Sequence, residues 1–251
     1  MLEPRVVRAD NPGPFTLDGT RTYIVGVDDV VVVDPGPDDE SHSEAVAQEV
    51  LGARRVHVLV THHHPDHAGG APALARRLGT SFSGPGAGAD KPLAAGDRWT
   101  TDAGELVAVA ASGHSPDHVV FHWPEAEAVF VGDVILGEGE TTWVGEYPGC
   151  VADYLESLNR IEALSPRRLY SAHGPPVEDP AERIRLFRRH RLDRIRQVEE
   201  LAAAHPSADA QELTGRVYGA ELPEALRAAA VQSVQAILHH LESGERHPGE
   251  G

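Results

Sequence analysis

Short apolar runs and segments with helical spacing alternate along the first 175 residues. The apolar and β-branched runs predict strands at residues 22–27, 30–33, 56–60, 105–110, 119–123, 128–131 and 169–171. Apolar positions three and four residues apart predict helices at residues 41–51, 71–78 and 151–164. Ser41, with Glu44 three residues on, predicts a capping box at the first helix. Strands that alternate with helices indicate an α/β fold.

The pattern changes in two places. Residues 83–104 are rich in glycine and proline, which predicts a loop with little regular structure. After about residue 178 no strand pattern recurs, and Asp179-Pro180 is typical of a helix start. Apolar spacing then predicts three helices, at residues 179–203, 208–217 and 221–241. We therefore expect two domains, an α/β domain over residues 1–178 and a small helical domain over residues 179–251.

Composition narrows the class of protein. The chain has 251 residues, of which 41% are hydrophobic and 24% charged, so it is neither disordered nor fibrous. A single cysteine, Cys150, excludes an intramolecular disulfide and a cysteine-rich zinc ribbon. The longest aliphatic run, residues 30–33, is too short to span a membrane, and the first residues lack the features of a signal peptide. We expect a cytoplasmic protein with no membrane partner.

Residues 61–70 carry the most distinctive chemistry. Directly after the predicted strand 56–60, four imidazoles and one carboxylate lie within six residues: His62, His63, His64, Asp66 and His67. Neutral imidazole is a good ligand for zinc, and a divalent ion removes the repulsion between crowded imidazoles. His62 and His64, two residues apart, can point the same way, and Asp66 and His67 can reach a second position nearby. The segment predicts a metal site rather than a histidine-rich surface loop.

Three further segments place a histidine or an aspartate beside a glycine after a predicted strand. They are Gly113-His114, Gly132-Asp133 and His173-Gly174. A rigid scaffold presents functional groups at such strand ends. One histidine in this position is more often structural, but three segments with the same relation to strands favour ligation.

The ordered set His-x-His-x-Asp-His, then a histidine, an aspartate and a histidine, resembles the metallo-β-lactamase fold superfamily over residues 34–173. The resemblance implies a four-layer αββα sandwich. It implies one metal ion held by His62, His64 and His114. It implies a second held by Asp66, His67 and His173. Asp133 would bridge both ions, and Asp34 and His118 are candidates for supporting the ligands from behind.

Other segments resemble one branch of that superfamily, named for β-lactamase-like protein 2. They are residues 11–20, 171–175 and 190–197. This branch carries a small winged-helix-like domain at its C-terminus, which agrees with the helices predicted after residue 178. Arg21 departs from the branch, where asparagine is expected, and little chain remains after Leu241 for a β-wing. The histidine run at residues 62–64 is also similar to the metal motif of glyoxalase II-type thioesterases.

The resemblance implies a dinuclear metal-dependent hydrolase, in which a hydroxide held between two divalent ions attacks the substrate. Asp66 and Asp133 are the catalytic candidates. Histidine and carboxylate ligands favour Zn²⁺, with iron and manganese as alternatives. The preferred substrate is a small ester or thioester of the acyl-thiol type. A β-lactamase or lactonase is less favoured. Asp133 stands where the antibiotic-degrading enzymes usually have a cysteine or another pattern, those enzymes are exported, and only one lysine, Lys91, could clamp a lactam carboxylate.

The alternative substrate is single-stranded RNA, which would make the protein an endoribonuclease, the activity that the resembling branch implies. Arginines gather on the predicted helix 179–203, and we take Arg188 and Arg191 as candidate substrate contacts. The same arginines also fit a solvated helix face paired with acidic residues. The formal net charge of −17 weighs against RNA, since 39 acidic residues oppose 22 basic ones. A homodimer is left open.

Overall fold

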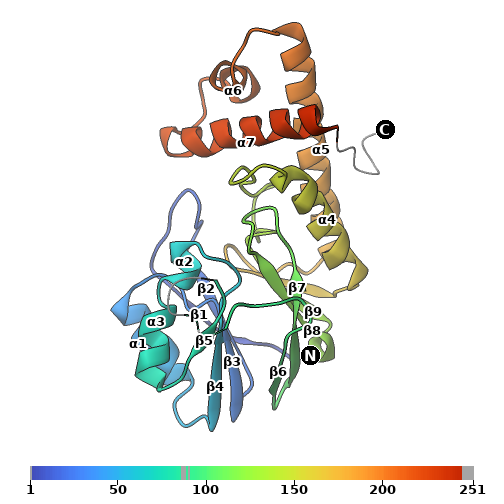
Figure 1. Ribbon diagram of the computed structural model, residues 1–251. Helices are drawn as coiled ribbons and strands as arrows, with labels where there is room; N and C mark the ends of the chain where they lie inside the picture. Colours follow the sequence, from blue (N-terminus) through green and yellow to red (C-terminus); the bar gives the residue numbers. More distant parts are fainter. Residues whose placement is uncertain (1, 86–88, 90, 245–251) are drawn as a thin grey trace.

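The computed structural model describes residues 2–85, 89 and 91–244, and it contains two five-stranded sheets packed face to face (Figure 1). The first sheet has the order β1-β2-β3-β4-β5, formed by Arg5–Arg8, Arg21–Val25, Asp29–Val33, Arg55–Leu59 and Phe82–Ser83. The second has the order β10-β9-β8-β7-β6, formed by Arg168–Ser171, Ala128–Gly132, Val119–Trp123, Gly104–Ala110 and Arg98–Thr101. Both sheets are mixed.

Helices cover the outer faces of both sheets. On the first sheet lie α1, α2 and α3, which are Glu40–Glu49, Pro65–Ala68 and Ala71–Leu78. On the second lies α4, Cys150–Ala163, and a 3₁₀ turn, Pro124–Ala126, links β8 to β9. The layer order is therefore αββα, as the resemblance implies.

Alternation along the strands explains why the sequence shows nearly continuous apolar runs. In β3, Val31 and Val33 belong to the core between the sheets, whereas Val30 and Val32 belong to the core beneath α1 and α3. Successive side chains of a strand point to opposite faces, and here both faces are covered. Strands that are covered on both faces, such as β3, therefore need apolar residues at consecutive positions.

Parallel pairing brings several strand ends to one edge of the sandwich. β3 pairs parallel with β4, and β9 pairs parallel with β10, so the segments that follow these four strands emerge together. The two sheets are joined near this edge, where Val119 N donates to Thr61 O at 2.9 Å and Arg21 N donates to Ala172 O at 2.8 Å. Functional residues that follow the strands are thus held on one rigid edge.

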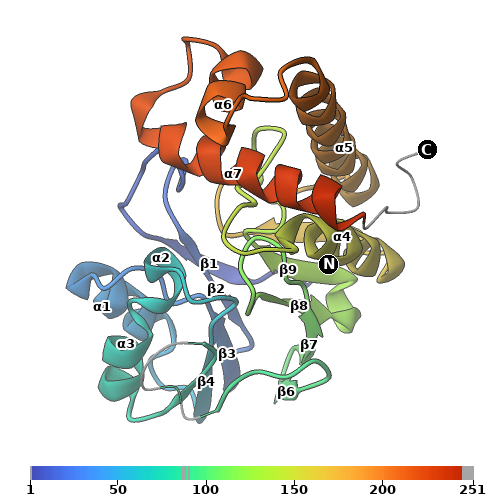
Figure 2. The ribbon, with the colours of Figure 1, turned by 45° about the horizontal axis from the view of Figure 1, so that its top comes forward.

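The C-terminal helices share one hydrophobic core with the second sheet and α4. They are α5, α6 and α7, formed by Pro180–Ala204, Ala210–Tyr218 and Glu224–Ser243. Figure 2 shows α7 lying across the loops at one end of the sandwich. One buried cluster contains Val131 of β9, Leu155 of α4, Phe187 of α5 and Ile237 of α7. Within the described range 179–244 no strand occurs. The type of secondary structure therefore changes near residue 178, but the hydrophobic core continues across that position.

Two local expectations are wrong, and one strand was not predicted. Asp39, not Ser41, caps α1, because its Oδ1 accepts the backbone N–H of His42 at 2.8 Å. The Ser41 hydroxyl instead donates to that same carboxylate at 2.6 Å. The loop expected over residues 83–104 contains β6, although residues 86–88 and 90 lie outside the described part. The sequence also gave no signal for β1, whose side chains are half-buried or exposed.

The shared core makes a testable claim about α7. Ile237 is fully buried, so Ile237→Ala is expected to lower the free energy of unfolding of the whole chain by about 2–5 kcal/mol. The exposed neighbour Gln235 is the matched control, and Gln235→Ala is expected to change it by less than about 0.5 kcal/mol. Urea denaturation followed by circular dichroism measures both. Equal effects of the two variants would contradict the shared core.

Candidate metal centre

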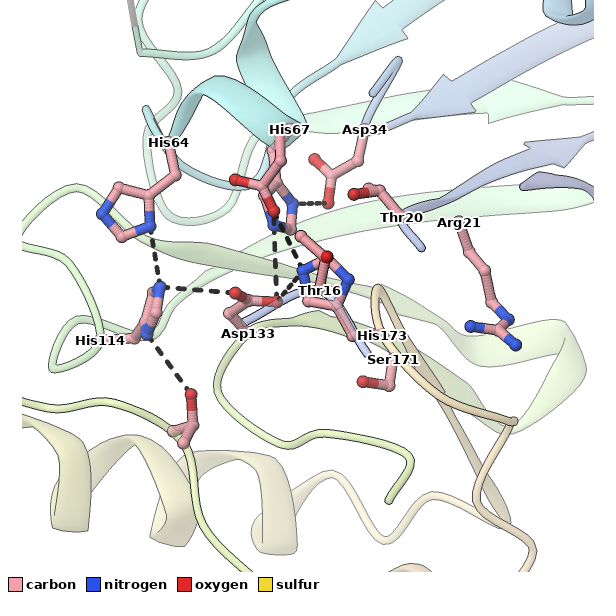
Figure 3. A network of polar contacts seen from close by, with 12 residues as sticks. Thr16, Thr20, Arg21, Asp34, His64, His67, His114, Asp133, Ser171 and His173 are labelled. Atoms are coloured by element: carbon pink, nitrogen blue, oxygen red, sulfur yellow. Dashed lines mark hydrogen bonds and ion pairs between the residues drawn. The ribbon is translucent and has the colours of Figure 1, made fainter. Parts of the chain in front are cut away.

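All seven residues that the sequence proposes as metal ligands come together at the edge where the strands end. Figure 3 shows His64, His67, His114, Asp133 and His173 of this set. His62 and His64 follow β4, and Pro65 starts the short helix α2, which carries Asp66 and His67. The other three follow strands of the second sheet: His114, Asp133 and His173.

Three imidazoles converge in the first group. His62 Nε2 lies 2.9 Å from His64 Nδ1, and His64 Nδ1 lies 3.0 Å from His114 Nε2. Zinc–nitrogen bonds of about 2.0–2.1 Å in tetrahedral geometry place ligand atoms roughly 3.3 Å apart. The three ring nitrogens therefore match one face of such a site after a small expansion.

The second group combines one carboxylate with two imidazoles. Asp66 Oδ2 lies 3.1 Å from His173 Nε2 and 3.4 Å from His67 Nε2. Both imidazoles are fully buried. This spacing again fits ligands that surround one ion.

Asp133 lies between the groups and presents one carboxylate oxygen to each. Its Oδ1 is 3.3 Å from His173 Nε2 and 3.5 Å from His67 Nε2, and its Oδ2 is 3.6 Å from His114 Nε2. Asp133 Oδ1, His67 Nε2 and His173 Nε2 are buried and make no hydrogen bond among the described residues. Buried polar atoms seldom lack a partner, so these converging lone pairs fit a cation.

Electrostatics distinguish the two groups. Burial lowers the pKa of His62 well below its usual value and lowers the pKa of His114 to about 4, so these imidazoles are neutral. Burial also opposes protonation of His173, but Asp133 and Asp66 outweigh it and raise the pKa of His173 to about 9. The carboxylates of Asp133 and Asp66 thus favour a positive charge beside His173. A divalent ion supplies it through the same lone pair that a proton would occupy.

The buried carboxylate of Asp34 supports the ligands from behind. Its Oδ1 accepts the backbone N–H of Thr61 at 2.7 Å, and its Oδ2 lies 2.9 Å from both the Thr61 hydroxyl and His67 Nδ1. These contacts fix the start of the histidine loop and turn His67 Nε2 toward the centre (Figure 3). Asp34 has a φ of 52°, in the left-handed region, so the chain accepts some backbone strain here.

His118 supports the centre from another side. Its ring stacks on His62 with centroids 4.6 Å apart, and its Nε2 accepts the backbone N–H of Asp133 at 3.2 Å. On the opposite flank, His114 Nδ1 lies 2.9 Å from the carbonyl oxygen of Trp143. The Trp143 contact gave no sequence signal, because it depends on how the loop before α4 folds back.

His63 is not one of the seven residues, although its ring lies against His64, with centroids 4.8 Å apart, and forms a further candidate metal group with His64 and Glu146. Its Nδ1 lies 2.9 Å from Asp117 and its Nε2 lies 2.9 Å from Glu146, at a partly exposed position. Both acidic partners were missed by the sequence analysis. His63 therefore ties two loops together at the rim of the centre.

A cavity of about 780 Å³ lies over the cluster and beneath the C-terminal helices. His64, Asp66, His114 and Asp133 line it on the metal side. Its remaining walls are mainly apolar and come from distant segments, including Phe15, Trp143, Tyr218, Leu222 and Leu226. Volumes of 300–1,000 Å³ are typical of small-molecule sites.

The two arginines proposed as substrate contacts lie in different surroundings. Arg191 lines the cavity, whereas Arg188 forms an ion pair with Glu162 of α4 at 2.7 Å and is not among the lining residues. Arg21, the departure noted in the sequence, forms two hydrogen bonds with Asp18, at 2.8 and 2.7 Å. Asp18 Oδ1 also accepts the N–H of Gly174 at 3.3 Å, so Arg21 steadies the loop beside His173.

Comparison with known proteins decides the family. A model described as the metallo-beta-lactamase superfamily matches residues 16–85 and 101–173. The chain belongs to the metallo-beta-lactamase superfamily. A second model, described as a beta-lactamase associated winged helix domain, matches residues 210–246, which include α6 and α7. The predicted fold class is confirmed, and the chain is a metal-dependent hydrolase of this superfamily.

Relatives refine the position within the superfamily. A Beta-lactamase-like protein 2 homolog of Caenorhabditis elegans is 31% identical, over 92% of this chain and 81% of that protein. An atrochrysone carboxyl ACP thioesterase of Cryptosporiopsis sp. is also 31% identical, over 96% of this chain and 80% of that protein. A beta-lactamase domain protein of Burkholderia ambifaria has a similar structure, with a TM-score of 0.81 at 23% identity, over 99% of this chain and 90% of that one. The resemblance to the β-lactamase-like protein 2 branch is thereby confirmed.

The support given by Asp34 can be tested through metal affinity. Asp34→Asn keeps the shape of the side chain but turns one acceptor into a donor that faces Thr61 or His67. We expect the affinity for divalent metal to fall roughly 10- to 100-fold, measured by competition with a chromogenic chelator. Asp117→Asn, which changes a partner of His63 outside the cluster, is the control and should leave the affinity unchanged. An Asp34→Asn protein with normal affinity contradicts the supporting role.

Proposed function

We propose that the protein is a thioester hydrolase that uses two divalent ions, preferentially zinc, on substrates of the acyl-thiol type. The observation that carries the proposal is the cavity, which joins the seven-residue cluster to largely apolar walls. An acyl chain gains about 25 cal/mol for each Å² of apolar surface that it buries there. The thioesterase name of the Cryptosporiopsis relative supports the same class of substrate.

The residues divide the work by position. His62, His64 and His114 would hold one ion, and Asp66, His67 and His173 the other, with Asp133 shared between them. Bound there, divalent ions supply a hydroxide nucleophile at neutral pH and polarise the thioester carbonyl. Asp66, which lines the cavity and is partly exposed, is placed to orient the attacking water and to pass a proton to the leaving thiol.

The structure gives no support to RNA within the described residues. Arg185, Arg188 and Arg196 of α5 each pair with a carboxylate, so α5 does not present a continuous arginine face for phosphates. The walls of the cavity are mainly apolar, with Arg191 and Arg194 on one side, and do not form a continuous basic groove. A homodimer likewise finds no support in the described part of the chain.

A lactam substrate is disfavoured by the position of the one lysine. Lys91 pairs with Asp97 at 2.8 Å and is not among the residues that line the cavity.

No helix in the described part of the chain is both long and apolar enough to cross a membrane. The cytoplasmic location stays a prediction.

Metal analysis tests the dinuclear proposal. Protein purified with zinc present and then passed through a desalting column is expected to retain close to two zinc ions per chain, because two groups of ligands share Asp133. Inductively coupled plasma mass spectrometry measures the ratio. One ion or fewer would refute a dinuclear centre.

An activity panel tests the substrate. Among acyl-pantetheine thioesters, lactones, β-lactams and single-stranded RNA, we expect turnover to be fastest with the thioesters. Asp133→Asn should lower kcat/KM for them roughly 100-fold or more, since it removes the shared carboxylate charge. The control is Asp117→Asn, which lies outside the cluster and should stay within about twofold of the unaltered protein. Faster turnover of RNA than of thioesters would overturn the proposal.

A further inference from the structure

Two arginines on one wall of the cavity lack acidic partners. Among the residues that the structure describes, no carboxylate lies within ion-pair distance of Arg191 or Arg194, and both line the cavity. Of the other arginines of α5, Arg185, Arg188 and Arg196 have such partners, whereas Arg183 and Arg189 have none among the described residues but do not line the cavity. The distinction is notable in a chain whose formal net charge is −17, because acidic partners are abundant.

Arg191 is buried and has a hydrogen-bond donor without an acceptor among the described residues. Its residue surface is only 3% exposed, and its Nη2 donates to Thr142 O at 3.0 Å. Its Nε is buried and makes no hydrogen bond among the described residues. A buried cation without a counter-charge is costly, and it is stabilised when an anion binds beside it.

Aromatic rings hold both guanidinium groups in place. The Cζ atom of Arg191 lies 5.4 Å from the centroid of the Tyr154 ring, and that of Arg194 lies 4.3 Å from the centroid of the Tyr218 ring. A stacked, planar guanidinium has lost much of its freedom before a ligand arrives. It offers its N–H groups in the fixed fork that suits carboxylate and phosphate oxygens.

Thr142 links Arg191 to the seven-residue cluster. Thr142, whose carbonyl oxygen accepts from Arg191, has its hydroxyl oxygen 3.4 Å from His114 Nδ1. Thr142, His114, Arg191 and Arg194 all line the same cavity. An anionic group bound by the arginines would therefore belong to the molecule whose thioester lies at the cluster.

We propose that Arg191 and Arg194 form a subsite for an anionic group of the thioester substrate, either a carboxylate on the acyl chain or a phosphate on the thiol. The proposal rests on the thioesterase function proposed above and adds a charge requirement to it. The apolar residues Leu222 and Leu226 would then hold the uncharged part of the acyl chain.

Binding of three unreactive thioethers tests the subsite without depending on catalysis. The probes are S-butyl pantetheine, which is neutral, S-(3-carboxypropyl) pantetheine, and S-butyl 4′-phosphopantetheine. Isothermal titration calorimetry with the zinc-loaded full chain is expected to show that one anionic probe binds roughly 10- to 100-fold tighter than the neutral probe. Preference for the carboxylate probe places the charge on the acyl chain, and preference for the phosphate probe places it on the thiol.

Variants assign that preference to the arginines. Arg191→Met and Arg194→Met are expected to remove most of the preference for the anionic probe and to leave binding of the neutral probe within about twofold. Arg188→Met is the matched control, because Arg188 lies on the same helix but pairs with Glu162 outside the cavity. Arg194 is only partly buried, so Arg194→Met keeps the test available if thermal melting shows that Arg191→Met does not fold.

The outcomes separate this subsite from the proposed function. Equal binding of all three probes by the unaltered protein, or an unchanged preference in both cavity variants, overturns the anion subsite. Hydrolysis of S-butyryl pantetheine, a neutral thioester, tests the thioesterase function separately. Charge-selective binding without thioester hydrolysis would retain the subsite and reject the thioesterase.

Discussion

The buried carboxylate of Asp133 imposes the constraint on which the centre depends. It lies among the five histidines of the seven-residue cluster, and its two oxygens face different groups of them at 3.3–3.6 Å. A negative charge in such a place is stable only when positive charge is fixed around it. The surrounding ligands are themselves held by Asp34, His118 and backbone carbonyls, so the demand for a cation is built into the fold rather than into one loop.

The sandwich meets this constraint through its topology. Asp34, His62, Asp133 and His173 each follow a strand of one of the two parallel pairs, so four segments distant in sequence reach one edge. Both faces of those strands are packed, as the alternate valines of β3 show. Packing on both faces restricts motion of the strand ends, which is what a site with ångström-scale geometry requires.

The sequence predicted those parts of the molecule whose structure depends on a local residue pattern. Buried strands were found because their apolar runs are continuous, and the seven residues that converge at the strand ends were singled out because their types and order are distinctive. Edge strands such as β1 and β6 escaped, since their half-exposed residues show no such run. The cap of α1 was misplaced because Asp39 and Ser41 are both good N-caps, and only the backbone decides between them.

The cavity could not be predicted from the sequence, because its walls depend on how α5 packs against the rest of the chain. Arg188 and Arg191 are about one helical turn apart. Arg188 nevertheless forms an ion pair with Glu162 of α4, whereas Arg191 lines the cavity. Which face of α5 meets which neighbour depends on the core shared by α4, α5 and α7. That core therefore fixes more than stability. It sets the position of the wall that faces the candidate metal ligands, and under the proposed function the C-terminal helices would contribute to substrate choice while the sandwich carries the metal centre.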